Sequence, residues 1–215
     1  CIDIDWNVYE TVQIGEQLWM AENLKVTHYN DGSEIQYVQQ ESSEPDVWVN
    51  LSTGAYAVYP ADDDENSIAT CGDNCADVYG NLYNWYVVDD DRGVCPEGWH
   101  VPSDDEWTIW TDFIAPEGIM GWGNSIAGGK MKEAGLDHWN SPNTEATNES
   151  GFTGLPAGYR TGTDGTYHNM GNYGYFWSSS EYYSTHVWAR YLGFHSSNVY
   201  RFTSYKHSGF SIRCL

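Results

Sequence analysis

Two runs of acidic residues have the composition of a cation site. They are Asp62, Asp63 and Asp64, and further along the chain Asp89, Asp90 and Asp91. Hard cations such as calcium need several carboxylate and carbonyl oxygens, which clustered acids in loops can supply. Neither run has the spacing of an EF-hand loop, and a solvated acidic loop would look the same. Calcium is therefore a possible cofactor, with these six aspartates as its candidate ligands.

The stretch from Tyr182 to His207 is rich in side chains suited to binding other molecules, because tyrosines, histidines and serines alternate along it. Tyrosine gives a large rigid contact area at low entropic cost, serine and histidine adapt their hydrogen bonds, and antibody paratopes use a similar mixture. Sugar rings also stack on tyrosine. We expect an exposed ligand-binding cluster made of Tyr182, Tyr183, His186, Arg190, Tyr200 and Tyr205. The alternative is that many of these rings pack inside the domain.

The five cysteines are Cys1, Cys71, Cys75, Cys95 and Cys214. A single Cys-x-x-x-Cys pair without a second pair or nearby histidines makes a poor zinc site, so disulfides fit better. We predict a Cys95–Cys214 bond that ties the main motif block to the chain end, and a local Cys71–Cys75 bond. Cys1 is left over. Lipoprotein processing leaves an acylated cysteine at the first position, but the segment could also simply begin there.

The charge of the chain limits its partners. It carries 31 acidic and 9 basic side chains, a formal net charge of −22, whereas nucleic acids and anionic membranes need a basic surface. After Glu181 there is no further acid, but four basic residues follow: Arg190, Arg201, Lys206 and Arg213. This basic end either neutralises acidic loops of the same domain or forms a binding face for a polar or anionic ligand.

Short elements must position these groups. Residues 6–24 alternate apolar and polar residues around Gly15 and Glu16, which predicts a β-hairpin. Ser103 to Glu106 form a capping box that starts a helix, which should end near Ala115 because Pro116 follows. Its core face is predicted to hold Trp107, Trp110, Phe113 and Ile114.

Two further short helices are predicted, over residues 79–88 and 130–134, and the Gly-rich and Tyr-rich segments after residue 151 indicate antiparallel strands. No internal repeat or linker interrupts the chain. We therefore expect one domain over residues 1–215. It comprises an N-terminal hairpin (1–26), an acidic loop region (27–78) and a main motif block (79–215).

Eight segments in order carry a resemblance to a known family: VQIGEQLWMAENL, YGNLYNWYVV, VCPEGWHVPSDDEW, GGKMKEAG, SGFTGLPAGYR, GYFWSSSE, ARYLGF and GFSIRCL. Together they resemble the Fibrobacter succinogenes major paralogous domain. More loosely they are similar to the formylglycine-generating-enzyme branch of the C-type lectin fold. The resemblance implies an α+β, C-type-lectin-like fold in which short helices pack on small antiparallel sheets with much loop.

Proteins of this family are found as lipoproteins or secreted proteins, so the resemblance implies an extracellular or outer-surface location. The function expected is a non-catalytic binding module, an adhesin or receptor for a glycan or a surface protein. The alternative is a self-associating structural subunit of a surface layer or filament. An enzyme of the formylglycine-generating type needs a cysteine pair in the C-terminal half, where this chain has only Cys214. Membrane contact is expected only through a lipid on Cys1.

Overall fold

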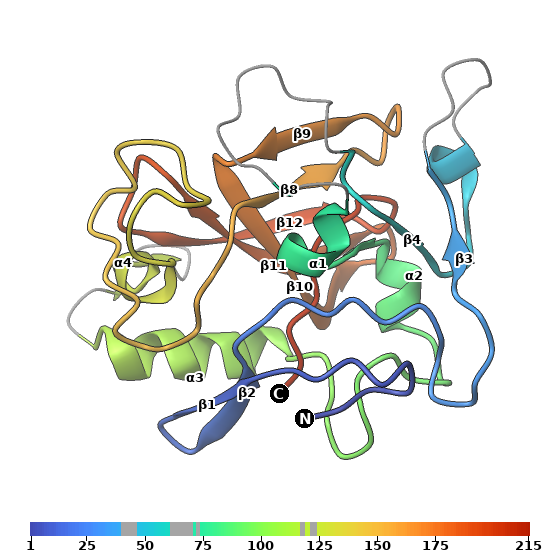
Figure 1. Ribbon diagram of the computed structural model, residues 1–215, viewed down its shortest axis with the longest axis horizontal. Coiled ribbons are helices and arrows are strands. Elements are labelled where there is room, and N and C mark those ends of the chain that lie inside the picture. Colours follow the sequence, from blue (N-terminus) through green and yellow to red (C-terminus); the bar gives the residue numbers. More distant parts are fainter. Residues whose placement is uncertain (40–46, 61–70, 72–73, 117–118, 121–123) are drawn as a thin grey trace.

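The computed structural model describes residues 1–39, 47–60, 71, 74–116, 119–120 and 124–215. This described part is an α+β structure with many short strands and a few short helices, as the sequence predicts (Figure 1). The helical segments are η1 (Val47–Asn50), α1 (Cys75–Tyr79), α2 (Trp85–Val88), α3 (Asp104–Ile114) and α4 (Gly128–Met131). No helix in this part is long and apolar enough to cross a membrane.

Within the described residues, the strands form three sheets. One is the hairpin of β1 (Thr11–Ile14) and β2 (Gln17–Met20), and another joins β3 (Gln36–Tyr37), β4 (Ala55–Ala57) and β5 (Leu82–Tyr83). The third has seven strands in the order β6-β7-β12-β11-β10-β8-β9. Its strands are β6 (Ile119–Met120), β7 (Asn124–Ser125), β8 (Ala157–Arg160), β9 (Tyr167–Met170), β10 (Tyr173–Tyr183), β11 (His186–Gly193) and β12 (Val199–Tyr205).

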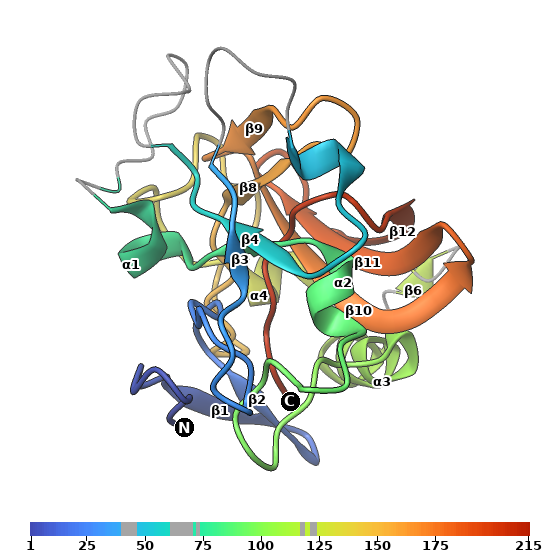
Figure 2. The ribbon, with the colours of Figure 1, turned by 90° about the vertical axis from the view of Figure 1, so that its right-hand side faces the viewer.

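The long strands β10, β11 and β12 have different surroundings on their two faces. On one face, Arg190 of β11 and Arg201 of β12 both bind Asp104 at the start of α3. Side chains alternate along a strand, so the neighbouring residues Tyr191 and Tyr200 point to the opposite face. Figure 2 shows α3 below β10, with β8 and β9 on the other side of the molecule. Helix α3 therefore covers one face of the sheet and leaves the other to different partners.

An aromatic core joins the hairpin, α3 and the sheet. The Trp19 ring lies 4.7 Å from Trp107 and 4.9 Å from Trp110, and Phe152 lies 4.6 Å from Trp110. All four side chains are fully buried. The predicted hairpin is confirmed, with Gly15 in the left-handed region (φ 60°) at its turn. Its buried Trp19 attaches it to the rest of the core.

The predicted capping box of α3 is confirmed in both directions. The Ser103 hydroxyl accepts a bond from the Glu106 amide at 3.2 Å, and the Glu106 carboxylate accepts one from the Ser103 amide at 2.8 Å. The predicted core face is wrong at one position, because Phe113 is 61% exposed. It lies four residues after Ile109, which is equally exposed, on the side of α3 away from the buried Trp107.

The other helix predictions are partly correct. The segment 79–88 is not one helix, because α1 ends at Gly80 (φ 72°), where a Cβ atom would lie 2.7 Å from Asn23 Cβ. Strand β5 follows and pairs with β4, and only residues 85–88 are helical. Helix α4 starts and ends earlier than the predicted 130–134. Within 27–78, the described residues contain β3, η1, β4 and α1.

Both predicted disulfides are present. Cys95 is bonded to Cys214 across 119 positions of the sequence, and Cys71 to Cys75 across four. The chain end lies beside the hairpin, since the Met20 amide donates to the Cys214 carbonyl at 3.0 Å. Among the described cysteines, Cys1 is free and half-buried, and its amino group donates to the Tyr9 carbonyl at 2.8 Å. The predicted acylation of Cys1 stays a prediction.

Candidate binding surface on the C-terminal sheet

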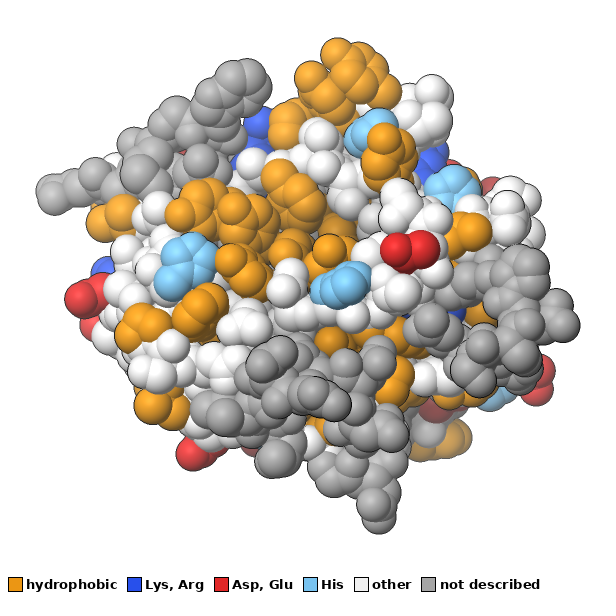
Figure 3. Space-filling view, turned by 90° about the horizontal axis from the view of Figure 1, so that it is seen from above, with side chains coloured by type: hydrophobic (Ala, Val, Ile, Leu, Met, Phe, Trp, Pro, Cys, Tyr) orange, Lys and Arg blue, Asp and Glu red, His pale blue; other side chains and the backbone are white. Residues whose placement is uncertain are grey.

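Six aromatic rings line the face of the large sheet that α3 does not cover. We call this surface the aromatic face: Tyr159, Tyr173, Tyr175, Tyr191, Tyr200 and Phe202, all half-buried. Figure 3 shows hydrophobic side chains gathered in a patch on the side of the molecule where β8 and β9 lie, with histidines at its border. The rings therefore form a broad, partly solvent-exposed surface rather than an enclosed core.

Strand register produces a row of tyrosines across three strands. Tyr175 of β10 pairs with Tyr191 of β11, which pairs in turn with Tyr200 of β12. The Tyr191 and Tyr200 rings are stacked, with centroids 4.6 Å apart and planes 13° apart, and the Tyr175 and Tyr191 centroids are 5.6 Å apart. Cross-strand pairs of this kind lie side by side on one face. Tyr159 extends the row, 4.9 Å from Tyr175.

Buried residues hold these rings in place. Phe210 is stacked against Tyr175 at 5.1 Å, and its ring also lies 4.2 Å from that of the buried Trp177. Burial raises the pKa of Tyr175 and of Tyr191 above that of a free tyrosine, so both hydroxyls stay neutral. The Tyr200 hydroxyl lies 3.1 Å from the Ser196 hydroxyl and accepts a bond from Nδ2 of the Asn198 side chain at 3.2 Å. The face thus offers ring surfaces together with neutral polar groups.

Two histidines edge the aromatic face. The His195 ring lies 5.7 Å from Tyr173, and the exposed His168 ring lies 5.6 Å from Tyr159. His168 also contacts the Thr166 hydroxyl at 2.8 Å, and that hydroxyl donates to Asp164. Hydrogen bonds from Thr161 and Thr166 hold the pKa of Asp164 down at about 2. Hydrogen-bond donors and acceptors therefore lie at the edge of the aromatic face.

A cavity opens beside the turn between β10 and β11. We call it the hairpin pocket; its volume is about 370 Å³ and it is lined by Val49, Tyr86, Gly162, Thr163, Ser184, Thr185, Tyr205, Lys206 and His207. Lys206 bonds to Glu181, and its ammonium lies 4.4 Å from the Trp85 ring. The Tyr86 hydroxyl lies 3.4 Å from His207 Nε2. Two tyrosines, two threonines and one serine, all with hydroxyl groups, thus line this concave site.

The structure divides the predicted binding residues into two groups. Tyr182, Tyr183, His186 and Tyr205 lie near the hairpin pocket, where Tyr182 is 4.1 Å from Tyr183 and His186 is 4.3 Å from Tyr205. The exposed fractions of the three tyrosines are 43%, 63% and 51%. Tyr200 lies nearer the start of β12, on the aromatic face. The predicted exposure is confirmed for these tyrosines, but the single cluster is not.

The prediction that Arg190 is an exposed binding residue is wrong. Arg190 is 1% exposed and donates to the Asp104 carboxylate at 2.7 Å. Its position in β11 points it toward α3 instead of toward solvent. Arg201 donates to the same carboxylate, and Arg213 donates to the carbonyls of Phe152 and Thr153. Arg190 and Arg201 therefore neutralise an acid of the same domain, which is the first of the two interpretations of the basic end, whereas Arg213 is bonded to neutral carbonyls.

Comparison with known proteins identifies the family. The chain matches the family model of the Fibrobacter succinogenes major domain over residues 12–215. It belongs to that family. No curated protein and no solved structure gives a significant match to it.

In this family member, the structure describes one of the two runs of candidate calcium ligands and not the other. Asp62, Asp63 and Asp64 lie outside the described residues. Asp90 accepts bonds from the Arg92 guanidinium at 2.8 and 2.7 Å, and these bonds hold its pKa below the ordinary value. In the described part, no group of three or more histidines, cysteines or acids is arranged to hold a metal ion. Calcium at Asp89, Asp90 and Asp91 stays a prediction.

The sequence analysis of this family member did not select Tyr159, Tyr173, Tyr175 or Phe202. A local signal existed for two of them, since Tyr173 and Tyr175 are two positions apart in β10 and therefore share a face. Tyr159 comes from β8, whose parallel pairing with β10 joins Gly158 to Gly174. That contact is set by topology and not by any local sequence pattern.

Proposed function

We propose that this domain is a non-catalytic carbohydrate-binding module of a bacterial cell surface, with a C-type-lectin-like fold, and that its ligand binds on the aromatic face. The observation that carries the proposal is the cross-strand row of Tyr175, Tyr191 and Tyr200. The C–H bonds of a sugar ring are weakly positive and pack well against the negative face of an aromatic ring. Neighbouring hydroxyls and histidines would bond the hydroxyls of the sugar.

The remaining features are consistent with an exported binding protein. Two disulfides fit an oxidising compartment, because cytosolic thiols are normally kept reduced. A net charge of −22 disfavours nucleic acid and anionic lipid as ligands. Attachment to the membrane would come only through a lipid on Cys1. The C-type-lectin-like assignment draws support from the chain end lying beside the N-terminal hairpin.

The test is a glycan array probed with and without a calcium chelator, followed by calorimetric titration of the sugars that bind. Tyr191→Ala and Tyr200→Ala should each weaken binding by more than ~1 kcal/mol, about fivefold, if these rings are anchors. Tyr200→Phe keeps the ring and should retain most of the affinity. Trp6→Ala is the matched control, since Trp6 is an 83% exposed ring in the N-terminal segment. Thermal melting of each variant separates loss of binding from loss of folding.

Three results would redirect the proposal. Unchanged binding by folded Tyr191→Ala and Tyr200→Ala would remove the aromatic face as the site. Binding to surface proteins but to no glycan would make the domain a protein receptor. Concentration-dependent assembly in sedimentation experiments, abolished by the same two substitutions, would favour the structural subunit of a layer or filament.

A further inference from the structure

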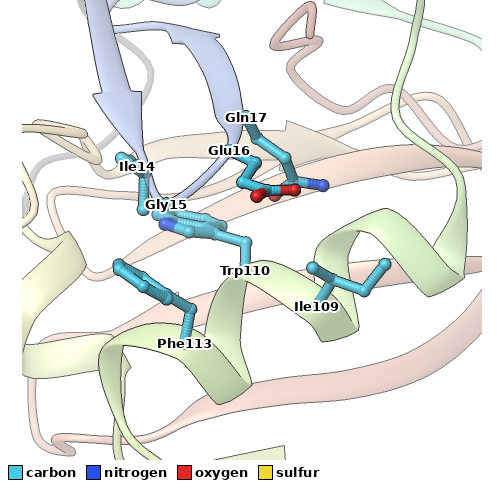
Figure 4. Close-up of a pocket in the computed structure, with 7 residues that line it drawn as sticks. All are labelled: Ile14, Gly15, Glu16, Gln17, Ile109, Trp110 and Phe113. Carbon is cyan, nitrogen blue, oxygen red and sulfur yellow. The ribbon is translucent and has the colours of Figure 1, made fainter.

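A second, separate groove lies between the β1–β2 turn and α3. It is lined by Ile14, Gly15, Glu16, Gln17, Ile109, Trp110 and Phe113, with a volume of about 400 Å³. Figure 4 shows Ile109, Trp110 and Phe113 projecting from α3 beneath the hairpin turn, which carries Gly15 and Glu16. Because α3 covers the opposite face of the sheet, this groove and the aromatic face are different surfaces.

The groove exposes apolar side chains that a folded domain usually buries. Ile109 and Phe113 are each 61% exposed. Ile109 and Phe113 are four residues apart in α3, so they lie on one side of the helix. Neighbouring exposed apolar side chains commonly mark a site of protein interaction.

The indole N–H of Trp110 provides an independent indication of a ligand. Six other tryptophans of the described part are fully buried, and each donates its N–H to an oxygen: Trp19, Trp48, Trp85, Trp107, Trp139 and Trp177. Trp110 is equally buried, but its Nε1 has no acceptor among the described residues. A buried N–H without an acceptor carries an unrecovered desolvation cost. An oxygen from a ligand would remove that cost.

Charge indicates what kind of ligand fits. The charged side chains of α3 are all acidic: Asp104, Asp105, Glu106 and Asp112. Asp104 is neutralised by two arginines, but Asp105 is exposed, and Glu16 at the hairpin turn is exposed as well. None of the seven described residues that line the groove is basic. A positively charged partner is therefore favoured.

We propose that this groove binds a basic segment of another polypeptide in an extended conformation. One apolar side chain of that segment lies between Ile109 and Phe113, a main-chain carbonyl accepts the Trp110 N–H, and lysine or arginine side chains lie near Glu16 and Asp105. An extended segment suits this contact because its main-chain carbonyls are free, whereas those inside a helix are already bonded. The Phe113 ring rests against Gly15, and because it is largely exposed it can rotate to open the path to the indole. This proposal is independent of the carbohydrate site.

The test uses a pair of synthetic peptides with blocked ends, acetyl-Lys-Leu-Lys-Phe-Lys-amide and its acidic counterpart acetyl-Glu-Leu-Glu-Phe-Glu-amide. Binding is followed by the indole ¹H–¹⁵N resonances, with that of Trp110 assigned from a Trp110→Phe variant. We expect the basic peptide to move the Trp110 resonance downfield and to bind at least tenfold more tightly than the acidic peptide. Glu16→Gln should weaken the binding of the basic peptide.

Exposed-site variants keep the test independent of folding. Phe113→Ala and Ile109→Ala should each reduce affinity at least fivefold, whereas Leu136→Ala, a 48% exposed residue outside the groove, should leave it unchanged. Equal binding of both peptides, or a Trp110 resonance that stays in place at saturation, would overturn the proposal. So would dimerisation in sedimentation experiments that Phe113→Ala abolishes, because the occupant would then be a second copy of this chain. Loss of sugar binding in the aromatic-face variants leaves this result untouched.

Discussion

Replacing Asp104 by alanine should strongly destabilise the domain. Asp104 is 8% exposed, and its carboxylate accepts bonds from Arg190 at 2.7 Å and from Arg201 at 2.7 and 3.0 Å. Asp104 is also the first residue of α3, where negative charge interacts favourably with the helix dipole. One side chain thus joins α3 to β11 and β12.

The size of the stability loss follows from the buried charge that Asp104→Ala leaves unpaired. Arg190 is 1% exposed, so in Asp104→Ala its charge stays buried without a counter-ion. Breaking a buried ion pair by removing one partner costs about 3–5 kcal/mol, which is a large fraction of the roughly 5–15 kcal/mol that stabilises a typical domain. The adjacent Asp105 is exposed, so Asp105→Ala should cost under about 1 kcal/mol, mainly through the helix dipole.

The contribution of Asp104 to the stability of the fold should depend on pH in the acid range. Burial raises the pKa of this carboxyl, but the hydrogen bonds and charges of Arg201 and Arg190 outweigh burial, so the pKa lies below the ordinary 3.8. The unfolded state then binds more protons than the folded state between these two values. The stability that Asp104 contributes is therefore complete only above about pH 5, where the unfolded-state carboxyl is also ionised. It is lost as the pH falls through the lower, folded-state value.

Urea unfolding at neutral pH, followed by circular dichroism, measures these differences. Asp104→Ala combined with Arg190→Leu removes the two buried charges and leaves only the half-buried Arg201 without its acid, so it should recover part of the stability that Asp104→Ala loses. The reasoning is refuted if Asp104→Ala costs no more than Asp105→Ala. It is also refuted if the double variant is less stable than Asp104→Ala alone, because the buried unpaired charge would then not be the cause.

Two further predictions concern cross-links within the fold. Removing the long-range disulfide with Cys95→Ala and Cys214→Ala, which are 119 positions apart, should cost about 5 kcal/mol in the chain-entropy model. Removing the local bond between Cys71 and Cys75, four positions apart, should cost only about 2 kcal/mol by the same urea assay; equal losses would contradict the loop-length argument. Lys132 is fully buried and its ammonium donates to the carbonyls of Thr144, Gly193 and Ser196. Lys132→Met should destabilise the domain by about 3 kcal/mol, because the Thr144 and Ser196 carbonyls lose the donor and the Gly193 carbonyl keeps only the Ser196 amide. A loss under about 0.5 kcal/mol would show that water replaces the ammonium.

Features that depend on neighbouring residues were predictable from the sequence. The capping box of α3 requires only Ser103 and Glu106 three positions apart, and both of its hydrogen bonds are present. The hairpin requires a turn between two alternating segments, and Gly15 supplies it. The Cys95–Cys214 bond is an exception, since its cysteines are 119 positions apart; it was predicted because it ties the main motif block to the chain end.

Features that depend on distant strands were not predictable in the same way. Leu82 and Tyr83 have helical spacing with their neighbours, but pairing of β5 with β4 and a bridge from Tyr83 to Phe210 make them extended. Arg190 and Tyr191 are adjacent in sequence and face opposite sides of one strand. Which of the two meets solvent is decided by the placement of α3, and no local pattern encodes that placement.

The distribution of charge explains why the aromatic face suits an uncharged ligand. All nine basic side chains lie in the described part, and four of them are buried: Lys132, Arg160, Arg190 and Arg213. Few cations are left at the surface to offset a net charge of −22. An anionic ligand would be repelled within a Debye length, about 8 Å at physiological salt. The six rings of the aromatic face carry no charge and offer neutral hydroxyls. On our proposal, a neutral sugar would gain ring stacking and hydrogen bonds there, without opposing the field of the whole domain.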